Sequence, residues 1–398
     1  MSRGLGPLAA LFLRLGATSF GGPAAHVAMM EEEVVRRRGW MTRERFLDLV
    51  GASQLIPGPN STELAIHIGY ARAGWAGLLI AGSCFIAPAL LIVWAVAWAY
   101  VQYGTLPAME GVLAGIKPVV LAVVAQALWS LGRSALVSAM SLAIGVVALV
   151  AVLMGVHEIA VLAGAAALAG LDWRLTRGGN PWERGATLVA PVGAADALRE
   201  AATAAGTTGA VAAGAAVSML TASAFSLGKL FLSFLKAGSL LFGSGYVLLA
   251  FLRADFVTRT GWLTESQLLD AVAVGQFTPG PLFTTATFVG YVLGGNAGAL
   301  LATIGIFLPA FAFVALTAPM LHRLRDVPAV RAVLGGLNAA SLALVVAVAI
   351  PLARDAFVRP SVSVPLFLVA FVALHHWRVN SAWLVLGGAM VGLLAGAA

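Results

Sequence analysis

Long apolar runs without a charged side chain dominate the sequence. They occupy residues 73–109, 134–157, 271–321, 332–353 and 379–398. Each run is long enough for at least one helix across a hydrocarbon core of about 30 Å, which takes about 20 residues. A transmembrane β-barrel would instead show alternating segments of about ten residues. The pattern therefore predicts an all-α polytopic membrane protein.

The same pattern occurs twice, at a separation of 222 residues. The recurring motifs are Phe12 to Gly16 with Phe234 to Gly238, Gly39 to Thr42 with Gly261 to Thr264, and Gln54 to Pro59 with Gln276 to Pro281. After one deletion the separation is 221 residues, as between Gly115 and Gly336. A duplicated half within an apolar chain is typical of transporters built from two structural repeats.

Each half is expected to open with a glycine-interrupted helix, at about 5–22 and 229–248. A polar connection follows, and then an amphipathic stretch that leads to a Pro-Gly-Pro motif at 57–59 or 279–281. Proline is tolerated at the first position of a helix and glycine breaks helices. Each motif is therefore predicted to separate two half-helices.

The repeats also set the expected domain boundaries. We expect a first repeat at 1–171, a linker at 172–228 and a second repeat at 229–398. The apolar segments that follow the motifs are 74–101, 111–132, 135–154 and 157–171, then 294–320, 332–352, 361–375 and 382–397. If the Pro-Gly-Pro segments are re-entrant and only the next helix crosses, the chain has about ten full spans plus two re-entrant elements.

Composition and loop charge refine this topology. Hydrophobic residues make up 60% of the chain and charged residues only 10%, which excludes an ordinary soluble domain. The net charge of +7 comes from basic residues in short loops, which indicate membrane orientation rather than nucleic-acid binding. Segment 24–45 carries five arginines and 101–110 none, whereas in the second repeat 322–331 is basic and 253–265 is balanced. Because basic loops stay cytoplasmic, the repeats are predicted to be inverted.

Few residues point to other chemistry. Cys84 is the only cysteine, which excludes an intramolecular disulfide and a dithiol redox mechanism within the chain. No metal or cofactor is expected, and the sequence has no Gly-rich phosphate loop. Energy for transport is therefore expected to come from an ion gradient.

The two helix breaks predict an anion site. Helix N-termini expose unpaired N–H groups and carry about half a positive charge, so facing half-helix starts at 57–60 and 279–282 are suited to an oxyanion. The alternative is that both motifs are merely tight turns. The candidate substrate-binding residues are Arg14, Lys236, Gly21, Gly22, Gly243, Gln54, Pro57, Gly58, Pro59, Asn60, Gln276, Pro279, Gly280, Pro281 and Lys117.

Basic residues recur at equivalent membrane positions, because Arg14 matches Lys236. A charge buried in an apolar helix costs about 2.5–3.5 kcal/mol unless it is paired or hydrated, so its presence in both copies indicates a function. The alternative is that both side chains snorkel to the headgroups. Lys117 corresponds to Asn338 and is a point of asymmetry.

Acidic residues are candidates for ion coupling. Asp48 and Asp270 are equivalent; they either receive protons or pair with Arg14 and Lys236, and pairing is the interpretation that we favour. Glu63 and His67 lie one helical turn apart in the first repeat only. They form either a proton relay or a hydrated polar face.

The order and duplication of these motifs resemble the chromate transporter family in its long, two-repeat form. The resemblance rests on Phe20 to Pro23, Gly39 to Thr42 and Gln54 to Pro59, and it spans most of the chain. It implies a bacterial inner-membrane carrier that exports chromate from the cytoplasm and confers chromate resistance. The second copy departs from the first, because Gly245 replaces Pro23 and Leu282 replaces Asn60.

The expected mechanism is alternating access. The dianion lies between the two motifs, Arg14 and Lys236 balance its charge, and one repeat rocks against the other. A carrier of the same fold for sulfate is the nearest alternative, since sulfate and chromate are both tetrahedral dianions. A membrane-embedded enzyme and a structural scaffold are the alternatives from other classes, and the symmetric glycines and prolines argue against an enzyme. The sequence is also compatible with a homodimer.

Overall fold

The computed structural model describes residues 4–20, 22–104, 107–176, 225–242, 245–320, 328–357, 360–377 and 379–396. All regular elements within these ranges are helical. Those of the first half are α1 (Leu5–Thr18), α2 (Gly22–Glu31), the π-helix η1 (Glu32–Arg37), α3 (Arg43–Ser53), α4 (Asn60–Tyr103), α5 (Pro107–Ala135), α6 (Ala139–Leu153) and α7 (Glu158–Leu175).

The second half repeats this order. Its elements are α10 (Leu227–Leu240), α11 (Val247–Leu252), the π-helix η2 (Arg253–Arg259), α12 (Glu265–Phe277), the short η3 (Leu282–Thr284), α13 (Thr285–Thr317), the short η4 (Ala318–Met320), α15 (Pro328–Ala356), α16 (Pro360–His375) and α17 (Ser381–Gly396). Most of the predicted linker, residues 177–224, lies outside the described residues.

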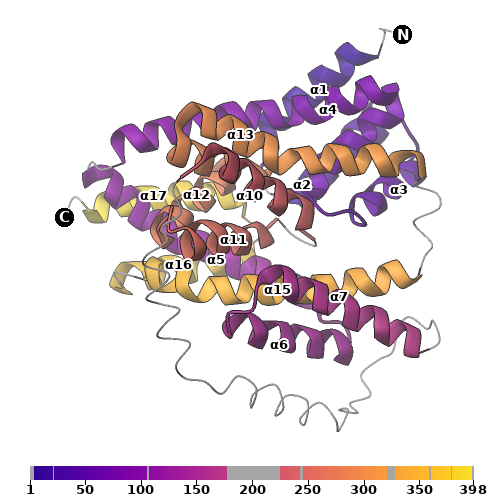
Figure 1. Ribbon diagram of the computed structural model, residues 1–398. Helices are drawn as coiled ribbons and strands as arrows, with labels where there is room; N and C mark the ends of the chain where they lie inside the picture. The colour runs from indigo at the N-terminus through magenta and orange to yellow at the C-terminus, as the bar shows by residue number, and fades with distance from the viewer. Residues whose placement is uncertain are drawn as a thin grey trace.

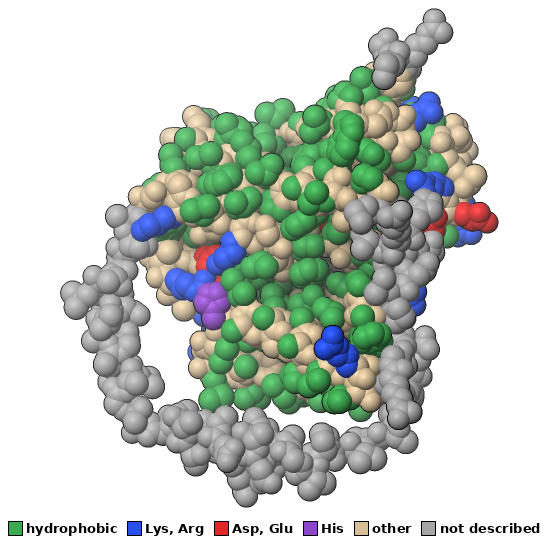
Figure 2. Space-filling model, turned by 45° about the vertical axis from the view of Figure 1, so that its right-hand side comes forward, with side chains coloured by type: hydrophobic (Ala, Val, Ile, Leu, Met, Phe, Trp, Pro, Cys, Tyr) green, Lys and Arg blue, Asp and Glu red, His purple; other side chains and the backbone are tan. Residues whose placement is uncertain are grey.

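The long helices have the length and composition of membrane spans. Stretches within α4, α5, α15 and the η3–α13 segment are long and apolar enough to cross a membrane, and α1, α6, α16 and α17 are shorter apolar helices. These helices run roughly parallel to one another in Figure 1. In Figure 2 the surface is mostly hydrophobic, and charged side chains gather mainly toward its left and right margins. The chain is therefore a polytopic membrane protein.

The predicted apolar segments agree with the helices to within a few residues. The polar connection expected after the first helix is itself helical: α2 and η1 follow α1, and α11 and η2 follow α10. Its charged residues pair with one another, since Arg37 contacts Glu32 and Glu33 within η1. Such pairs allow a charged segment to stay helical.

The chain reverses direction inside both α4 and α13. The backbone leaves helical geometry at Ala73 and Gly74 in α4, and at Gly294 and Gly295 in α13. The two arms of α13 lie side by side, because the hydroxyls of Thr287 and Thr303 are 2.7 Å apart. In α4 and α13 alike, a glycine of each arm faces the other arm with no room for a Cβ atom, namely Gly69 against Gly77 and Gly290 against Gly298.

Packing between the two halves is reciprocal. Helix α4 packs on α13, and α5 packs on α15, so each of these helices contacts its own counterpart. The terminal helices of each half are exchanged: α6 and α7 pack on α15, while α16 and α17 pack on α5 (Figure 1). The same surface used twice in this way is the signature of a two-fold relation.

Small residues allow these helices to approach closely. Gly115 of α5 meets Gly388 and Gly392 of α17, and Gly336 of α15 meets Ala165 of α7. Lipid tails are as apolar as leucine, so close backbone packing rather than removal of apolar surface from water drives helix association in a membrane. The exchanged arrangement is therefore built into the positions of the glycines.

Candidate functional site

A cavity lies between the two Pro-Gly-Pro breaks. Its volume is about 270 Å³, and residues 59–61 and 281–283 line it from the two halves. Helices that precede and follow the breaks complete the wall, with Pro23 and His26 of α2, Gly245 and Tyr246 before α11, and Ala127, Ser130 and Leu131 of α5. The cavity is thus built from both repeats, at the point where the helical structure of each repeat is interrupted.

Hydrogen bonds between the halves hold the two breaks in place. The Gly58 N–H donates to the carbonyl of Leu241 at the end of α10, over 2.7 Å. The Gly280 N–H donates to the carbonyl of Ser19 at the end of α1, over 2.9 Å. Each break is therefore anchored to the first helix of the other half.

Glycine is required at the centre of both motifs. Gly58 has φ of 138° and Gly280 has φ of 94°, a region that side chains other than glycine rarely adopt. A Cβ atom on Gly280 would also lie 2.9 Å from the Gly16 carbonyl oxygen. The spacing of proline and glycine therefore produces the break from the local sequence alone.

The wall of the cavity is mostly apolar, with a few polar side chains and no permanently charged group among its described lining residues. Asn60, Ser61, Ser130, His26 and Tyr246 supply its polar side chains. Asn60 is the first residue of α4, so the N-terminus of that helix faces the cavity with its partial positive charge. This combination of uncharged donors and a helix start is suited to an anion rather than a cation.

His26 is a cavity residue that sequence reasoning missed. The ring is 1% exposed, and its Nε2 lies 3.1 Å from the carbonyl oxygen of Ser19. That carbonyl also accepts the hydrogen bond from Gly280, so His26 is tied to the second break. The comparison of the two repeats does not point to His26, because the equivalent residue of the second repeat is not a histidine. A prediction of helix α2 would have been needed to place His26 on the same wall as Pro23.

Arg14 and Lys236 do not line the cavity. Arg14 pairs with Glu33 of η1, with 2.6 Å between Nη2 and Oε1. Lys236 pairs with Asp255 of η2 at 2.5 Å and with Glu158 of α7 at 3.6 Å. The structure therefore does not bring the two cations into position to balance a dianion at the cavity wall.

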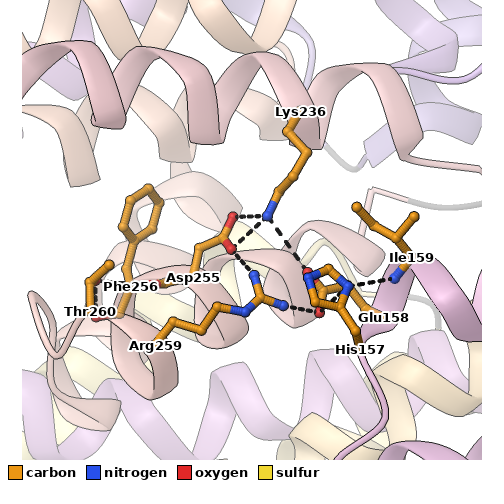
Figure 3. Close-up of polar contacts among 8 residues, drawn as sticks. All are labelled: His157, Glu158, Ile159, Lys236, Asp255, Phe256, Arg259 and Thr260. Carbon is orange, nitrogen blue, oxygen red and sulfur yellow. Dashed lines mark hydrogen bonds and ion pairs between the residues drawn. The ribbon is translucent and has the colours of Figure 1, made fainter. Parts of the chain in front are cut away.

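Figure 3 shows the second cluster, which is the group of charged residues formed by Lys236, Asp255, Arg259 and Glu158. Lys236 and Arg259 approach the same two carboxylates from opposite sides, and Arg259 contacts both Asp255 and Glu158. His157, which precedes α7, lies 3.6 Å from Glu158. The cluster joins α10 and η2 of the second half to α7 of the first.

The first cluster is formed by Arg14, Glu33, Arg37 and Arg38, and it keeps the Glu33 carboxylate ionised. Arg37 and Arg38 also contact Glu33, at 3.0 and 3.3 Å. Burial raises the pKa of Glu33, but hydrogen bonds from Arg14 and Arg38 outweigh burial. Together with the charge of Arg37, they leave that pKa below its usual value near 4.5.

The expected pairing of Asp270 with Lys236 is wrong. Asp270 lies 3.9 Å from Lys117 and accepts a hydrogen bond of 2.9 Å from the Tyr100 hydroxyl. Lys117 in turn donates to the Ser266 hydroxyl over 2.5 Å. The reason is positional: Asp270 is on α12, which packs on α5, whereas Lys236 faces η2. Asp48, the equivalent residue on α3, makes a polar or electrostatic interaction of its own.

Glu63 and His67 are completely enclosed on the first arm of α4. Neither side chain has a hydrogen-bond partner among the described residues. The Glu63 carboxyl lies directly against Gly58, since a Cβ atom there would collide with Oε1. An isolated buried carboxylate is strongly disfavoured, and both the proton relay and the hydrated polar face stay predictions for these two residues.

The remaining candidates divide by location. Pro59, Asn60 and Pro281 line the cavity. Gln276 lies beside it through a hydrogen bond with Tyr246, and Pro57, Gly58, Pro279 and Gly280 form the breaks themselves. Gln54 caps the end of α3, and Gly22 starts α2. Gly21 and Gly243 lie outside the described residues. Among the described residues no cluster of His, Cys, Asp and Glu is suited to a metal ion.

Comparison with known proteins agrees with this architecture. Residues 7–171 and 228–393 match the chromate transporter family. The chain is 32% identical to a chromate transport protein of Cupriavidus metallidurans, over 96% of this chain and 91% of that protein. It is 33% identical to a chromate transport protein of Pseudomonas aeruginosa, over 97% and 91%.

A more distant relative extends the comparison. The chain is 30% identical to a probable chromate transport protein of Synechococcus elongatus, over 93% of this chain and 89% of that protein. No solved structure matches the chain. The family match covers both halves and leaves out only the ends and the central segment, so this protein belongs to the chromate transporter family.

Proposed function

We propose that this protein is a secondary transporter that exports chromate across the bacterial inner membrane and thereby confers resistance. The observation that carries the proposal is the cavity between two equivalent helix breaks. Its volume of about 270 Å³ has room for a small tetrahedral ion with several waters, since water occupies about 30 Å³ per molecule in the liquid. The names of the relatives support chromate as the ion.

The dianion binds without a permanently charged partner in this proposal. The N-terminus of α4 and the side chains of Asn60 and Ser61 supply the hydrogen bonds and the partial positive charge. Arg14 and Lys236 have a structural role, because both belong to ion-pair clusters at the π-helices. Because each of these two cations is paired with a carboxylate of the protein, neither is free to bind the substrate.

The two halves form inverted repeats with boundaries at 1–171 and 229–398 in this proposal. The reciprocal hydrogen bonds of Gly58 and Gly280 support a two-fold relation between them. Loop charge supports an axis in the membrane plane, because 24–45 and 322–331 are the basic segments of the two halves. The reversals at Gly74 and Gly295 support re-entrant arms before each long span.

Ion coupling would use carboxyl groups close to the breaks. Glu63 lies against Gly58, and Asp270 is on α12, the helix that leads to the second break. A change of protonation at Glu63 alters the charge beside the first break, and one at Asp270 alters the charge on the helix that leads to the second break; coupling requires such a change. His67 lies one turn beyond Glu63 and extends the same buried polar strip.

Sulfate is the second candidate substrate. Chromate and sulfate have the same charge and tetrahedral geometry, and a wall of uncharged hydrogen-bond donors does not distinguish them strongly. A transporter of sulfate with the same fold therefore remains the alternative, whereas catalysis does not fit the cavity, which has no catalytic dyad among its described lining residues.

The test is uptake of labelled chromate into everted membrane vesicles, with and without an imposed proton gradient and with sulfate as competitor. Accumulation that depends on the gradient supports the exporter. Ser61→Ala should lower uptake about ten- to hundredfold if its hydroxyl bonds a dianion, because a hydrogen bond to a charged group is worth about 1.5–3 kcal/mol. Ser83→Ala, on the exposed face of α4, is the matched control.

The competing outcomes are distinct. Sulfate uptake without chromate uptake would keep the fold and replace the substrate. Equal losses in the Ser61 and Ser83 variants would show that the cavity is not the binding site.

A further inference from the structure

Two further cavities lie beyond the central one. The first, of about 340 Å³, is formed by the end of α5 and the end of α16, and Gln126, Arg133 and His375 line it. The second, of about 520 Å³, is formed by the end of α15, the α6–α7 turn and η2, and its charged lining residues are Glu158, Arg253, Arg259 and Arg354. Neither belongs to the cavity between the breaks.

The two cavities occupy equivalent places in the repeats. Arg133 and Arg354 are 221 residues apart, which is the register of this part of the duplication. Each lies two residues before the end of its helix, α5 or α15. Both side chains are exposed. The duplication has therefore placed one arginine at the wall of each cavity.

These two arginines differ from Arg253 and Arg259 in having no ion-pair partner within the part of the chain that the structure describes. Arg253 is paired with Glu265, and Arg259 contacts both Asp255 and Glu158 (Figure 3). No ion pair involves Arg133 or Arg354 among the described residues. An unpaired guanidinium at a cavity wall attracts anions and binds oxyanions through two parallel N–H groups.

The Arg133 cavity adjoins the central one, because Ser130 lines both. A small cavity of about 60 Å³, with Ser134, Asn338 and Ser341 in its wall, also adjoins the central one through Leu131. The Arg354 cavity shares no described lining residue with either of these two cavities, and its relation to the route is its equivalence to the Arg133 cavity.

A simpler role for the two arginines is to stabilise helix ends. Cations in the last turn interact favourably with the helix dipole, by about 0.3–1 kcal/mol. That role explains a positive charge at each position, but it predicts no effect that depends on the side of the membrane. A location of Arg133 at a cavity that adjoins the central one, and of Arg354 at the equivalent cavity of the other half, does predict such an effect.

We propose that Arg133 and Arg354 mark the two mouths of the transport route and recruit the oxyanion, one on each face of the membrane. The proposal rests on the proposed function and on inverted repeats, which put equivalent helix ends on opposite faces. Two helices, α6 and α7, separate the end of α5 from the basic segment after Arg174. Two crossings return the chain to the same face, and basic segments stay on the cytoplasmic face. The Arg133 mouth is therefore cytoplasmic, and the Arg354 mouth opens on the opposite face.

The test measures KM for labelled chromate in everted and in right-side-out vesicles. Arg133→Gln should raise KM about three- to tenfold for uptake into everted vesicles, which expose the cytoplasmic mouth, and leave it unchanged in right-side-out vesicles. Arg354→Gln should show the opposite dependence. Arg133→Lys and Arg354→Lys keep the charge but not the paired N–H groups, so they should restore part of the affinity, and high salt should weaken the wild-type advantage.

Lys229→Gln is the control, because Lys229 is an exposed cation of α10 that lines neither mouth. Equal losses in both orientations would show a structural role at the helix ends and overturn the proposal, as would unchanged KM in both variants. Sulfate is used as the probe if chromate is not carried, so a wrong substrate and a wrong mouth give different results. Absence of flux of both dianions would overturn the proposed function and this inference with it.

Discussion

The two charged clusters at the π-helices share one plan but differ in depth. In both, a carboxylate of the π-helix lies between a cation of the first helix and an arginine one turn later: Glu33 in the first half and Asp255 in the second. Arg14 is 49% exposed, whereas its counterpart Lys236 is 26% exposed. The same arrangement is therefore nearer to the surface in the first half.

Glu158 accounts for much of this difference. It comes from α7 of the first half and joins the second cluster through Lys236 and Arg259. At the corresponding start of α17 the chain has Ser381, which carries no charge. Duplication thus preserved the carboxylate between two cations, while one copy acquired a further acidic residue that links the halves.

A neighbouring pair teaches the same lesson. Arg43 pairs with Glu31 in the first half, and Arg253 pairs with Glu265 in the second. The residues are equivalent by the 222-residue register, but the acidic and basic members have changed places. What persisted is the contact between α3 or α12 and the preceding π-helix region, not the direction of the charge.

The largest effect is expected for Asp255→Asn. The change leaves Lys236 and Arg259 with only Glu158 as partner in a largely buried cluster. Removing one member of a buried ion pair costs about 3–5 kcal/mol. Because both cations are partly exposed, the expected loss of unfolding free energy is about 3 kcal/mol, at the lower end of that range. Denaturant unfolding in detergent micelles measures it; a loss no greater than that of the first-half variant would contradict the comparison.

A smaller effect is expected for Glu33→Gln, the equivalent change. Arg14 and Arg37 are about half exposed or more, so water compensates them once the carboxylate is neutral. Ion pairs of this kind contribute up to about 1 kcal/mol. The same unfolding titration checks this value, and Glu32→Gln, which removes a more exposed carboxylate of η1, is its control.

Acid sensitivity should distinguish Glu33→Gln from wild type. The pKa of Glu33 is lower in the folded protein than its usual value near 4.5. Its contribution to stability is therefore present above that value and is lost as the pH falls through the folded pKa. Between neutral pH and pH about 3, wild type should lose more unfolding free energy than Glu33→Gln; parallel pH profiles would rule out this contribution.

The smallest effect is expected when the exchanged pair is given the opposite polarity. Arg253→Glu combined with Glu265→Arg gives the second half the polarity of the first, and the contact survives. Partly exposed pairs are worth about 0.5 kcal/mol, so stability should change by less than that, while either single change brings like charges together and should cost more. A double variant no better than the single variants would show that polarity matters at this site.

Local sequence was sufficient for some of these features. The Pro-Gly-Pro breaks and the ends of the long helices follow from proline, glycine and apolar runs, which act within a few residues. The repeat register also carried information that the motif search did not use, since Glu33 with Asp255 and Arg37 with Arg259 recur at the same separation. Those residues mark the clusters that the structure contains.

Other features depend on contacts distant in the sequence. The participation of Glu158 in the second cluster, the position of His26 beside the second break and the partnership of Asp270 with Lys117 each join separate helices. No periodicity reports such a contact, because it depends on which helices become neighbours. Charge symmetry suggested that Asp270 would pair with Lys236, but helix packing decides the partner.

The exchange of terminal helices has a consequence for biosynthesis. Helices α5, α6 and α7 leave the ribosome before α15, yet α6 and α7 pack on α15, and α5 packs on α16 and α17. Their glycine-lined faces must therefore remain unmatched in the membrane until the last third of the chain has been inserted. The terminal helices of each half therefore find their main partner in the other half, and two halves synthesised as separate chains would have to meet before those helices packed.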